Sequence, residues 1–139
     1  MTFMHDDFHA LSHEITREEG FKYLVWNEIF DGTNPDSVPD SNKPIVQIWE
    51  PWKAVTDGWK PIMKNATSQG YQTILSTSWY LDLISYPYSD DRKYADWANY
   101  YEVNPTDFDG TVEEKARVLG GEGTYWSEYI DSTGIVQLF

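Results

Sequence analysis

Near the ends of four short apolar runs in this sequence, a tryptophan or tyrosine is followed one or two residues later by an aspartate or glutamate. The pairs are Trp26 with Glu28, Trp49 with Glu50, Tyr80 with Asp82, and Trp126 with Glu128. Aromatic rings exclude water and stack on apolar surfaces, whereas carboxylates accept hydrogen bonds from hydroxyl groups. A sugar offers both kinds of surface, because its ring has apolar faces and its edge carries hydroxyls. The four pairs are therefore candidates for a selective carbohydrate-binding site.

Each pair lies at or just after the end of a short apolar run. The runs are Lys22–Phe30, Pro44–Trp49, Tyr71–Tyr80 and Arg117–Trp126, and they contain the β-branched and aromatic residues of strands. They are nearly continuous rather than alternating, which is typical of parallel strands covered on both faces. Since the carboxyl ends of parallel strands meet at one rim of an α/β barrel, we expect the four pairs to form one aromatic cup.

Helix-like stretches separate these runs. Asp6–Gly20 has apolar residues at helical spacing and ends at a glycine, as does Thr56–Gly70. Thr111–Arg117 begins with a threonine that is followed three residues later by a glutamate, which is the pattern of a capping box. The alternation of strand and helix predicts an α/β fold, either a doubly wound sheet or a barrel.

The composition predicts one folded domain with an acidic surface. The chain has 139 residues, of which 17% are aromatic, and a formal net charge of −13, whereas disordered chains are poor in aromatics. An acidic surface repels phosphate backbones, so nucleic acid is not expected as a partner. The absence of cysteine excludes disulfides and thiolate metal sites. No apolar run approaches the ~20 residues of a membrane span, and the first ten residues lack the features of a secretory signal.

Four segments together resemble a known enzyme family. LVWNEIFDG, IVQIW, ILSTSWYLDLISY and VLGGEGTYWSEYIDST are similar, in order and spacing, to successive segments of the catalytic barrel of the β-N-acetylhexosaminidases, glycoside hydrolase family 20. The resemblance implies that residues 1–139 form a single partial catalytic domain. This domain would be an incomplete TIM (β/α)8 barrel, about strands five to eight, without the N-terminal half of the ~250-residue fold. Full-length members are expected to be lysosomal or secreted, and the compartment of this chain stays open.

The resemblance assigns the ring and carboxylate residues to one pocket for a terminal N-acetylhexosamine. The indoles implied to form the wall of the pocket around the sugar and its acetamido group are Trp26, Trp49 and Trp126. Tyr80 matches the tyrosine whose hydroxyl binds the acetamido carbonyl oxygen. Asp82 and Glu128 match carboxylates that hold hydroxyls of the same sugar. The implied partner is a glycan that ends in N-acetylhexosamine, and we expect no cofactor and no metal.

The family's chemistry also shows what this sequence lacks. The resemblance implies that the acetamido oxygen of the substrate is the nucleophile, an exception to the two-carboxylate scheme of most glycosidases. In the family, the glutamic acid of an adjacent Asp-Glu pair protonates the leaving oxygen, while the aspartate orients the amide. This sequence contains no Asp-Glu dipeptide, and the family's arginine from the first strand has no counterpart. We therefore predict a fragment of a β-N-acetylhexosaminidase that has the substrate-binding wall but is inactive by itself.

The sequence is also compatible with two further kinds of protein. It could be a non-catalytic sugar-binding protein that kept the aromatic wall and lost the acid, or a degenerate product of the family. Half a barrel also leaves its first and last strands with unpaired edges, which invite pairing with another copy. We therefore expect either poor solubility of the isolated chain or self-association through the exposed barrel edges.

Several remaining patterns are better accounted for by packing or solvation than by chemistry. His9 and His13 have the i, i+4 spacing of some zinc sites, but a third ligand is lacking, so a solvated start of a helix is favoured. Gly120–Gly123 lacks the lysine of a phosphate loop, so close backbone approach is the better interpretation. Adjacent carboxylates expected to face water are Glu18-Glu19, Asp90-Asp91 and Glu113-Glu114. Indoles expected to have plain packing roles are Trp52, Trp59, Trp79 and Trp97.

Overall fold

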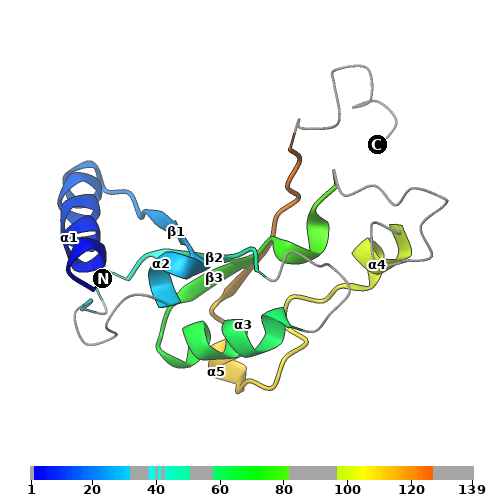
Figure 1. The fold of residues 1–139 in the computed structure, drawn as a ribbon. Coiled ribbons are helices and arrows are strands. Elements are labelled where there is room, and N and C mark those ends of the chain that lie inside the picture. Colours follow the sequence, from blue (N-terminus) through cyan, green and yellow to red (C-terminus); the bar gives the residue numbers. More distant parts are fainter. Residues whose placement is uncertain are drawn as a thin grey trace.

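The computed structural model describes residues 2–31, 38–39, 41, 43–50, 58–81 and 97–126, without the side chains of residues 2–6, 9, 17 and 97–99. The strands in these ranges are β1 (Leu24–Trp26), β2 (Ile45–Ile48), β3 (Gln72–Leu75) and β4 (Val118–Gly121). The helices are α1 (Thr2–Glu19), α2 (Asn27–Asp31), α3 (Trp59–Ser68), η3 (Thr77–Trp79, a 3-10 turn), α4 (Trp97–Glu102) and α5 (Val112–Lys115). Figure 1 shows their arrangement, with α1 at the end of the sheet where the strands begin.

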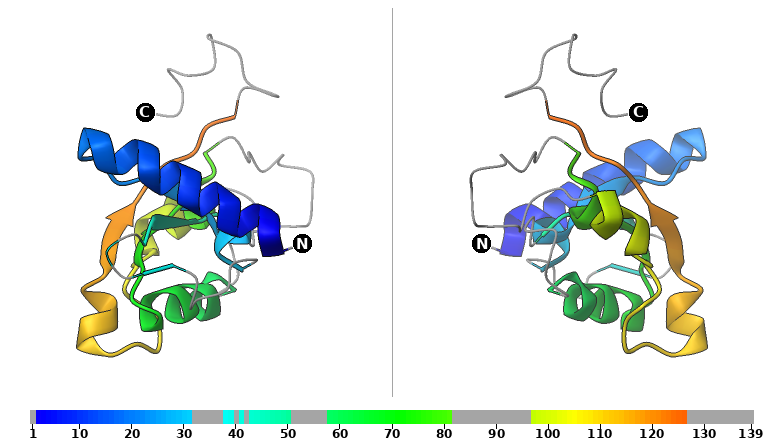
Figure 2. Two further views of the ribbon diagram at one scale, coloured as in Figure 1. Left: turned by 90° about the vertical axis from the view of Figure 1, so that its left-hand side faces the viewer. Right: turned by 90° about the vertical axis from the view of Figure 1, so that its right-hand side faces the viewer.

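The four strands form one parallel sheet in the order β1-β2-β3-β4, so strands that are sequential in the chain are neighbours. Val25 pairs with Val46, Val46 with Thr73, and Thr73 with Val118. Helix α3 connects β2 to β3 and lies with α5 on one face of the sheet (Figures 1 and 2). Parallel neighbours need a crossover connection, and here a helix provides it, as the alternation of apolar runs and helix-like stretches predicts.

The strand order separates the two architectures that the alternation allows. In a doubly wound sheet the strand order reverses at a switch point, whereas in a barrel each strand lies beside the next one in sequence. The consecutive order of this sheet is the order found in barrels. The mixed α/β fold is therefore consistent with part of a (β/α)8 barrel, as the resemblance implies.

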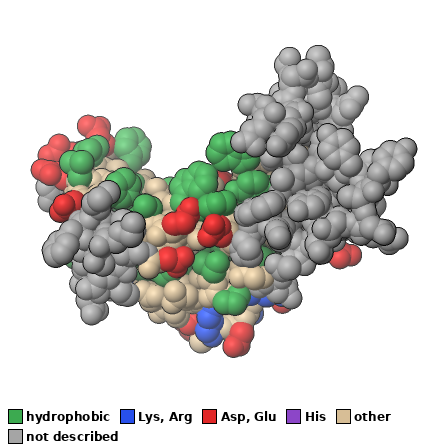
Figure 3. Space-filling model, viewed as in Figure 1, with side chains coloured by type: hydrophobic (Ala, Val, Ile, Leu, Met, Phe, Trp, Pro, Cys, Tyr) green, Lys and Arg blue, Asp and Glu red, His purple; other side chains and the backbone are tan. Residues whose placement is uncertain are grey.

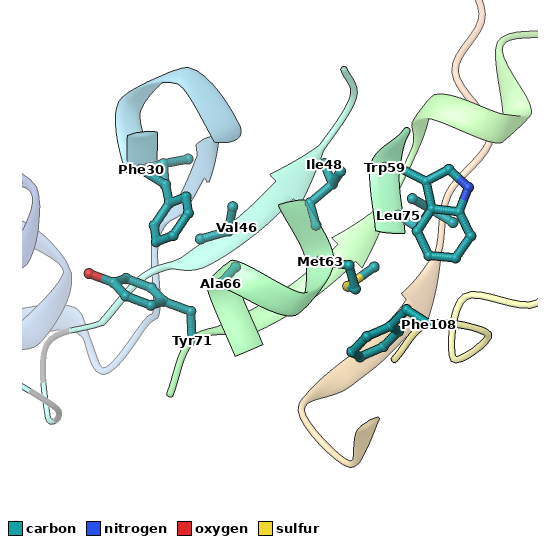
Figure 4. Close-up of a cluster of buried hydrophobic side chains, with 10 residues drawn as sticks. Phe30, Val46, Ile48, Trp59, Met63, Ala66, Tyr71, Leu75 and Phe108 are labelled. Atoms are coloured by element: carbon teal, nitrogen blue, oxygen red, sulfur yellow. The ribbon is translucent and has the colours of Figure 1, made fainter. Parts of the chain in front are cut away.

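The hydrophobic core lies between α3 and the sheet face that α3 covers. Val46, Ile48 and Leu75 are fully buried on this face, and each alternates with a more exposed neighbour along its strand. Figure 4 shows these side chains together with the residues of α3 that face them, which are Trp59, Met63 and Ala66. The burial of Trp59 confirms the packing role predicted for that indole. Trp52 and the side chain of Trp97 lie outside the described residues.

The predicted signals at helix ends are confirmed. Helix α1 ends before Gly20, which has a φ of 74°, and α3 ends before Gly70, which has a φ of 86°. Both values lie in the left-handed region that glycine adopts without steric cost. At the start of α5, the amide of Glu114 donates to Oγ1 of Thr111, and the amide of Thr111 donates to Oε2 of Glu114 at 2.8 Å. This is the reciprocal capping box expected from the sequence.

Three strands, β1, β3 and β4, end well before their apolar runs do, and β4 ends at Gly121 whereas its run continues to Trp126. The run Lys22–Phe30 is not one strand, because β1 ends at Trp26 and α2 begins at Asn27. The side chain of Asn27 is fully buried and accepts hydrogen bonds from the chain that follows β2. Likewise β3 ends at Leu75, and the rest of its run forms the turn η3. The turns α2 and η3, together with α4, are elements that the sequence does not predict.

The prediction that the strands are covered on both faces is wrong for the part of the chain that the structure describes. Val25 is 2% exposed, whereas its neighbours Leu24 and Trp26 are both 39% exposed. The described helices cover only one face, and in a barrel the opposite face of each strand lines the interior. We call this opposite face, which carries Trp26, Gln47 and Ile74 in register, the open face.

Candidate functional site

Indoles from three segments of the chain meet near the edge of the sheet where the strands end. Trp26 is the last residue of β1, Trp49 directly follows β2, and Trp126 follows β4. The ring centroids of Trp26 and Trp49 are 5.3 Å apart, and those of Trp26 and Trp126 are 6.4 Å apart. Trp26 and Trp126 are 39% and 43% exposed. The three rings, which we call the indole cluster, therefore present a part-exposed aromatic surface.

The first two residues of α2 fix the position of Trp49. Oδ1 of Asn27 accepts hydrogen bonds from the backbone amides of Trp49 at 3.1 Å and Glu50 at 3.3 Å. The Oε2 atom of Glu28 accepts a hydrogen bond from Nε1 of the Trp49 indole, and bonds to an ionised acceptor are stronger than neutral ones. The turn after β1 therefore holds both the backbone and the ring of Trp49 beside Trp26.

Backbone hydrogen bonds hold the segment that carries Trp126 beside the turn after β3. The amide of Thr124 donates to the carbonyl oxygen of Trp79 at 2.8 Å, and the carbonyl oxygen of Thr124 accepts from the amide of Leu81 at 2.8 Å. Thr124 also forms a parallel bridge with Tyr80. These contacts extend the pairing of β3 and β4 beyond the strands and direct the chain toward the position of Trp126.

The glycines before this segment allow close packing, as the sequence predicts. A Cβ atom at Gly121 would overlap the ring of Trp79, so only glycine fits without movement of the indole. Gly120 has a φ of 144°, which residues with a Cβ rarely adopt. The half-buried indole of Trp79 donates through Nε1 to the carbonyl oxygen of Tyr100 at 3.0 Å. The predicted close approach is confirmed at Gly121, whereas a Cβ atom at Gly120 would meet no neighbour, and the packing role predicted for Trp79 is confirmed.

A polar cluster joins the ends of three strands. Oε1 of Glu122, just after β4, accepts a hydrogen bond from Oγ of Ser76, just after β3, at 2.8 Å. The same oxygen accepts a hydrogen bond from Nε2 of Gln47 on β2, and this nitrogen lies 3.0 Å from Oγ of Ser76. Sequence reasoning missed this cluster. Its only signal was the single polar residue, Gln47, inside the apolar run Pro44–Trp49.

Of the other predicted site residues, the structure describes Tyr80 but not Asp82 or Glu128. Tyr80 is 7% exposed, and its carbonyl oxygen accepts a hydrogen bond from the hydroxyl of Tyr100 at 3.0 Å. The bridge to Thr124 brings Tyr80 beside the segment that leads to Trp126. Asp82 and Glu128 lie outside the described residues.

Acidic groups accompany the indole cluster. Partial burial raises the pKa of Asp31 at the end of α2, the side-chain amide of Asn27 acts in the opposite direction, and the nearby Glu28 carboxylate raises this pKa further. Figure 3 shows carboxylates next to hydrophobic side chains over the middle of the molecule. An acidic rim is suited to accept hydrogen bonds from neutral hydroxyls and is unfavourable for anions.

The described residues contain neither a cluster of metal-ligating side chains nor a helix that could span a membrane. No group of three or more His, Asp or Glu side chains that could hold a metal ion occurs among the described residues. The histidine pair weighed as a zinc site includes His9, whose side chain is not described. Of the helices within the described ranges, none is both long and apolar enough to cross a membrane.

The match to a known family covers nearly the whole chain. Residues 1–138 match the model of the catalytic domain of glycosyl hydrolase family 20. The chain belongs to this family. Membership confirms the resemblance of the four quoted segments. Hydrolase and glycosidase are therefore the enzyme classes of its family.

The curated relatives are β-hexosaminidase subunits. The chain is 42% identical over 112 residues to β-hexosaminidase subunit beta of Sus scrofa. These aligned residues make up 81% of this chain and 18% of that protein. It is 37% identical over 112 residues to subunit beta of Homo sapiens (81% and 17%) and 36% identical over 129 residues to subunit alpha of Bos taurus (88% and 21%). The chain thus spans about a fifth of the length of the curated family 20 relatives it matches.

Proposed function

We propose that this chain is part of the catalytic barrel of a β-N-acetylhexosaminidase and binds the terminal non-reducing N-acetylhexosamine of a glycan. The observation that carries the proposal is the contact of Trp26 with both Trp49 and Trp126 near the carboxyl ends of parallel strands. Active sites of barrels lie at this edge, and part-exposed rings offer apolar faces to a sugar. In this proposal residues 1–139 form one partial domain that corresponds to about strands five to eight.

The other proposed contacts follow from the family's residues. The hydroxyl of Tyr80 binds the carbonyl oxygen of the acetamido group, and Asp82 and Glu128 accept hydrogen bonds from hydroxyls of the same ring. Family membership and the parallel bridge that joins Tyr80 to Thr124 support these roles. Carboxylates suit this task, because a buried sugar hydroxyl without a partner costs binding free energy.

The proposed reaction of the complete barrel is hydrolysis with retention of configuration at the anomeric carbon. The acetamido oxygen bonds to the anomeric carbon while the bond to the leaving oxygen breaks, and an acid protonates that oxygen. Water then opens the cyclic intermediate. The part played by this chain is to hold the acetamido arm in line for attack, because correct alignment lowers the barrier of an intramolecular step.

A sugar titration tests the binding role. We expect N-acetylglucosamine to change the tryptophan fluorescence of the chain saturably, with a dissociation constant of about 1 mM or weaker, because a single sugar makes few contacts. Glucose, which lacks the acetamido group, should bind more weakly. Trp126→Ala should weaken binding by about tenfold, whereas Trp59→Phe, in the core, is the matched control and should not. Equal binding of the two sugars, or no effect of Trp126→Ala, contradicts the proposed pocket.

A turnover assay tests the proposed inactivity. The sequence has no Asp-Glu dipeptide, and a pocket without a proton donor binds a glycoside without cleaving it. Incubation of the purified chain with a chromogenic N-acetylglucosaminide should release no more colour than buffer alone. Turnover clearly above the buffer rate would overturn this part of the proposal.

The missing dipeptide also favours a second candidate function, a non-catalytic sugar-binding protein derived from the family. The two candidates differ in the sequence that surrounds this chain in its gene. A His-x-Gly-Gly-Asp-Glu segment in frame upstream supports part of an enzyme. Translation that starts at Met1 leaves the binding protein as a candidate.

We also propose that the isolated chain self-associates with a second copy. Phe8, Leu11 and Ile15 of α1 are 45%, 60% and 58% exposed, and exposed apolar side chains and strand edges favour association. Light scattering coupled to size-exclusion chromatography should give a mass above that of one chain. A monodisperse monomer that melts cooperatively contradicts the half-barrel proposal.

A further inference from the structure

Glu122 joins three strands of the sheet through a single carboxylate oxygen. Its Oε1 atom accepts hydrogen bonds from Ser76, at 2.8 Å, and from Gln47. Ser76 is fully buried and Gln47 is half-buried, so water competes weakly for these bonds. Hydrogen bonds to an ionised acceptor are about twice as strong as neutral ones. No Lys or Arg of the described part of the chain forms an ion pair with Glu122, so the two polar donors are what hold its carboxylate.

The position of Gln47 links this carboxylate to the indole cluster. Gln47 is the register partner of Trp26 in the pairing of β1 and β2, so the two side chains are neighbours on the open face. Trp49 lies two residues further along the same segment. Trp126 lies on the segment that begins at Glu122. The carboxylate therefore connects the side of the cluster formed by Trp26 and Trp49 to the segment that carries Trp126.

The other contacts hold each side of the cluster to a neighbouring strand. Asn27 and Glu28 hold Trp49 from the side of β1, and backbone bonds hold the Trp126 segment to the turn after β3. Neither set joins β2 to the segment after β4, because β3 lies between them in the sheet. The bond from Gln47 to Glu122 spans this gap across the open face. It is therefore suited to set the distance between the two sides of the cluster.

We propose that Glu122 is a positioning residue, which aligns Trp126 with Trp26 and Trp49 by accepting hydrogen bonds from Gln47 and Ser76. This inference rests on the proposed function only in that the aligned indoles bind a sugar. Both hydrogen bonds end on Oε1 of Glu122, so its second carboxylate oxygen is not needed to position Trp126. Glu122→Gln keeps one acceptor oxygen and should keep the alignment, whereas Glu122→Ala removes both bonds.

The experiment measures two properties of the same protein. Coupling between close indoles gives an exciton couplet in far-ultraviolet circular dichroism, and its size depends on the mutual orientation of the rings. The second property is the dissociation constant for N-acetylglucosamine from tryptophan fluorescence. We expect Glu122→Ala to reduce the couplet by about half and to weaken binding by about tenfold. Glu122→Gln should stay within about twofold of the wild type in binding, as should Glu19→Ala, an exposed matched control on α1.

The outcomes separate alignment from direct contact and from folding. An unchanged couplet in Glu122→Ala overturns the proposal. Equal loss of binding in both Glu122 variants with an unchanged couplet also overturns it, because the carboxylate then contacts the sugar itself. If Glu122→Ala does not fold, Gln47→Leu removes the donor instead and should reduce the couplet in the same way. If the wild type binds no sugar, the proposed function fails, and the couplet alone decides the role of Glu122.

Discussion

The two faces of the sheet use the same strands in different ways. On the face that α3 covers, fully buried apolar residues such as Val46, Ile48 and Leu75 pack against the helix. On the open face and at its rim, part-exposed indoles lie beside polar side chains that bond to one another across strands. Alternate residues of a strand serve the two faces, so a four-residue strand contributes to both at once.

The difference between the faces predicts where stability and shape come from. Fully burying one aliphatic side chain contributes about 1.5–3 kcal/mol. A hydrogen bond contributes about 1 kcal/mol net, but it fixes direction and distance. The covered face should therefore determine whether the chain folds, and the open face should determine how the indoles are arranged. Substitutions on each face test this division.

The largest effect should come from a pair of adjacent residues on opposite faces of β3. Leu75→Ala leaves a cavity in the core and should lower the free energy of unfolding by about 3 kcal/mol. Ile74→Ala, on the open face and half-buried, should cost only about 1 kcal/mol. Urea denaturation followed by circular dichroism measures both. Equal losses at the two positions would contradict the division between the faces.

A smaller effect is expected where the rim packs most tightly. Gly121→Ala places a methyl group against the ring of Trp79 and should cost about 2 kcal/mol, because the indole must move. Gly123→Ala is the matched control, since its Cβ atom would lie 3.3 Å from a terminal methyl of Leu81, which can adjust. Similar denaturation midpoints of the two variants would show that Trp79 moves at little cost in free energy. This result would contradict tight packing at the rim.

The capping box of α5 should contribute about as much as one hydrogen bond. Thr111→Ala removes the side-chain acceptor for the amide of Glu114 and should lower stability by about 1 kcal/mol. Val112→Ala, one residue further on and 79% exposed, is the control and should stay within about 0.5 kcal/mol of the wild type. An equal loss in the control would remove the cap as the cause.

The smallest effect should appear only at alkaline pH. Burial, with a contribution from Tyr71, raises the pKa of Tyr23 from 10.0 to about 12. Between these values the folded chain holds the proton more tightly than the unfolded chain does, so stability falls as the pH rises. The Tyr23→Phe variant has no hydroxyl to titrate, so its stability relative to the wild type should rise by under about 1 kcal/mol between about pH 10 and about pH 12, given the partial exposure of Tyr23. Urea midpoints of both proteins that fall in parallel would contradict the shift.

Local signals in the sequence determined the elements and the family. Glycines end α1 and α3 because only glycine reaches a positive φ without steric cost, and Thr111 with Glu114 caps α5 across three residues. The apolar runs indicated all four described strands and placed Trp26, Trp49 and Trp126 near strand ends. The family resemblance came from short segments in order, and the match over residues 1–138 confirms it.

The tertiary structure alone decided where strands stop and which side chains meet. β1 ends at Trp26 because Asn27 bonds to backbone amides more than twenty residues away, after β2. The bond from Gln47 to Glu122 joins residues separated by 75 positions. Which face of the sheet is covered depends likewise on where α3 packs. Such contacts exist only once the chain has folded, because local preferences act over a few residues, whereas register and packing bring distant residues together.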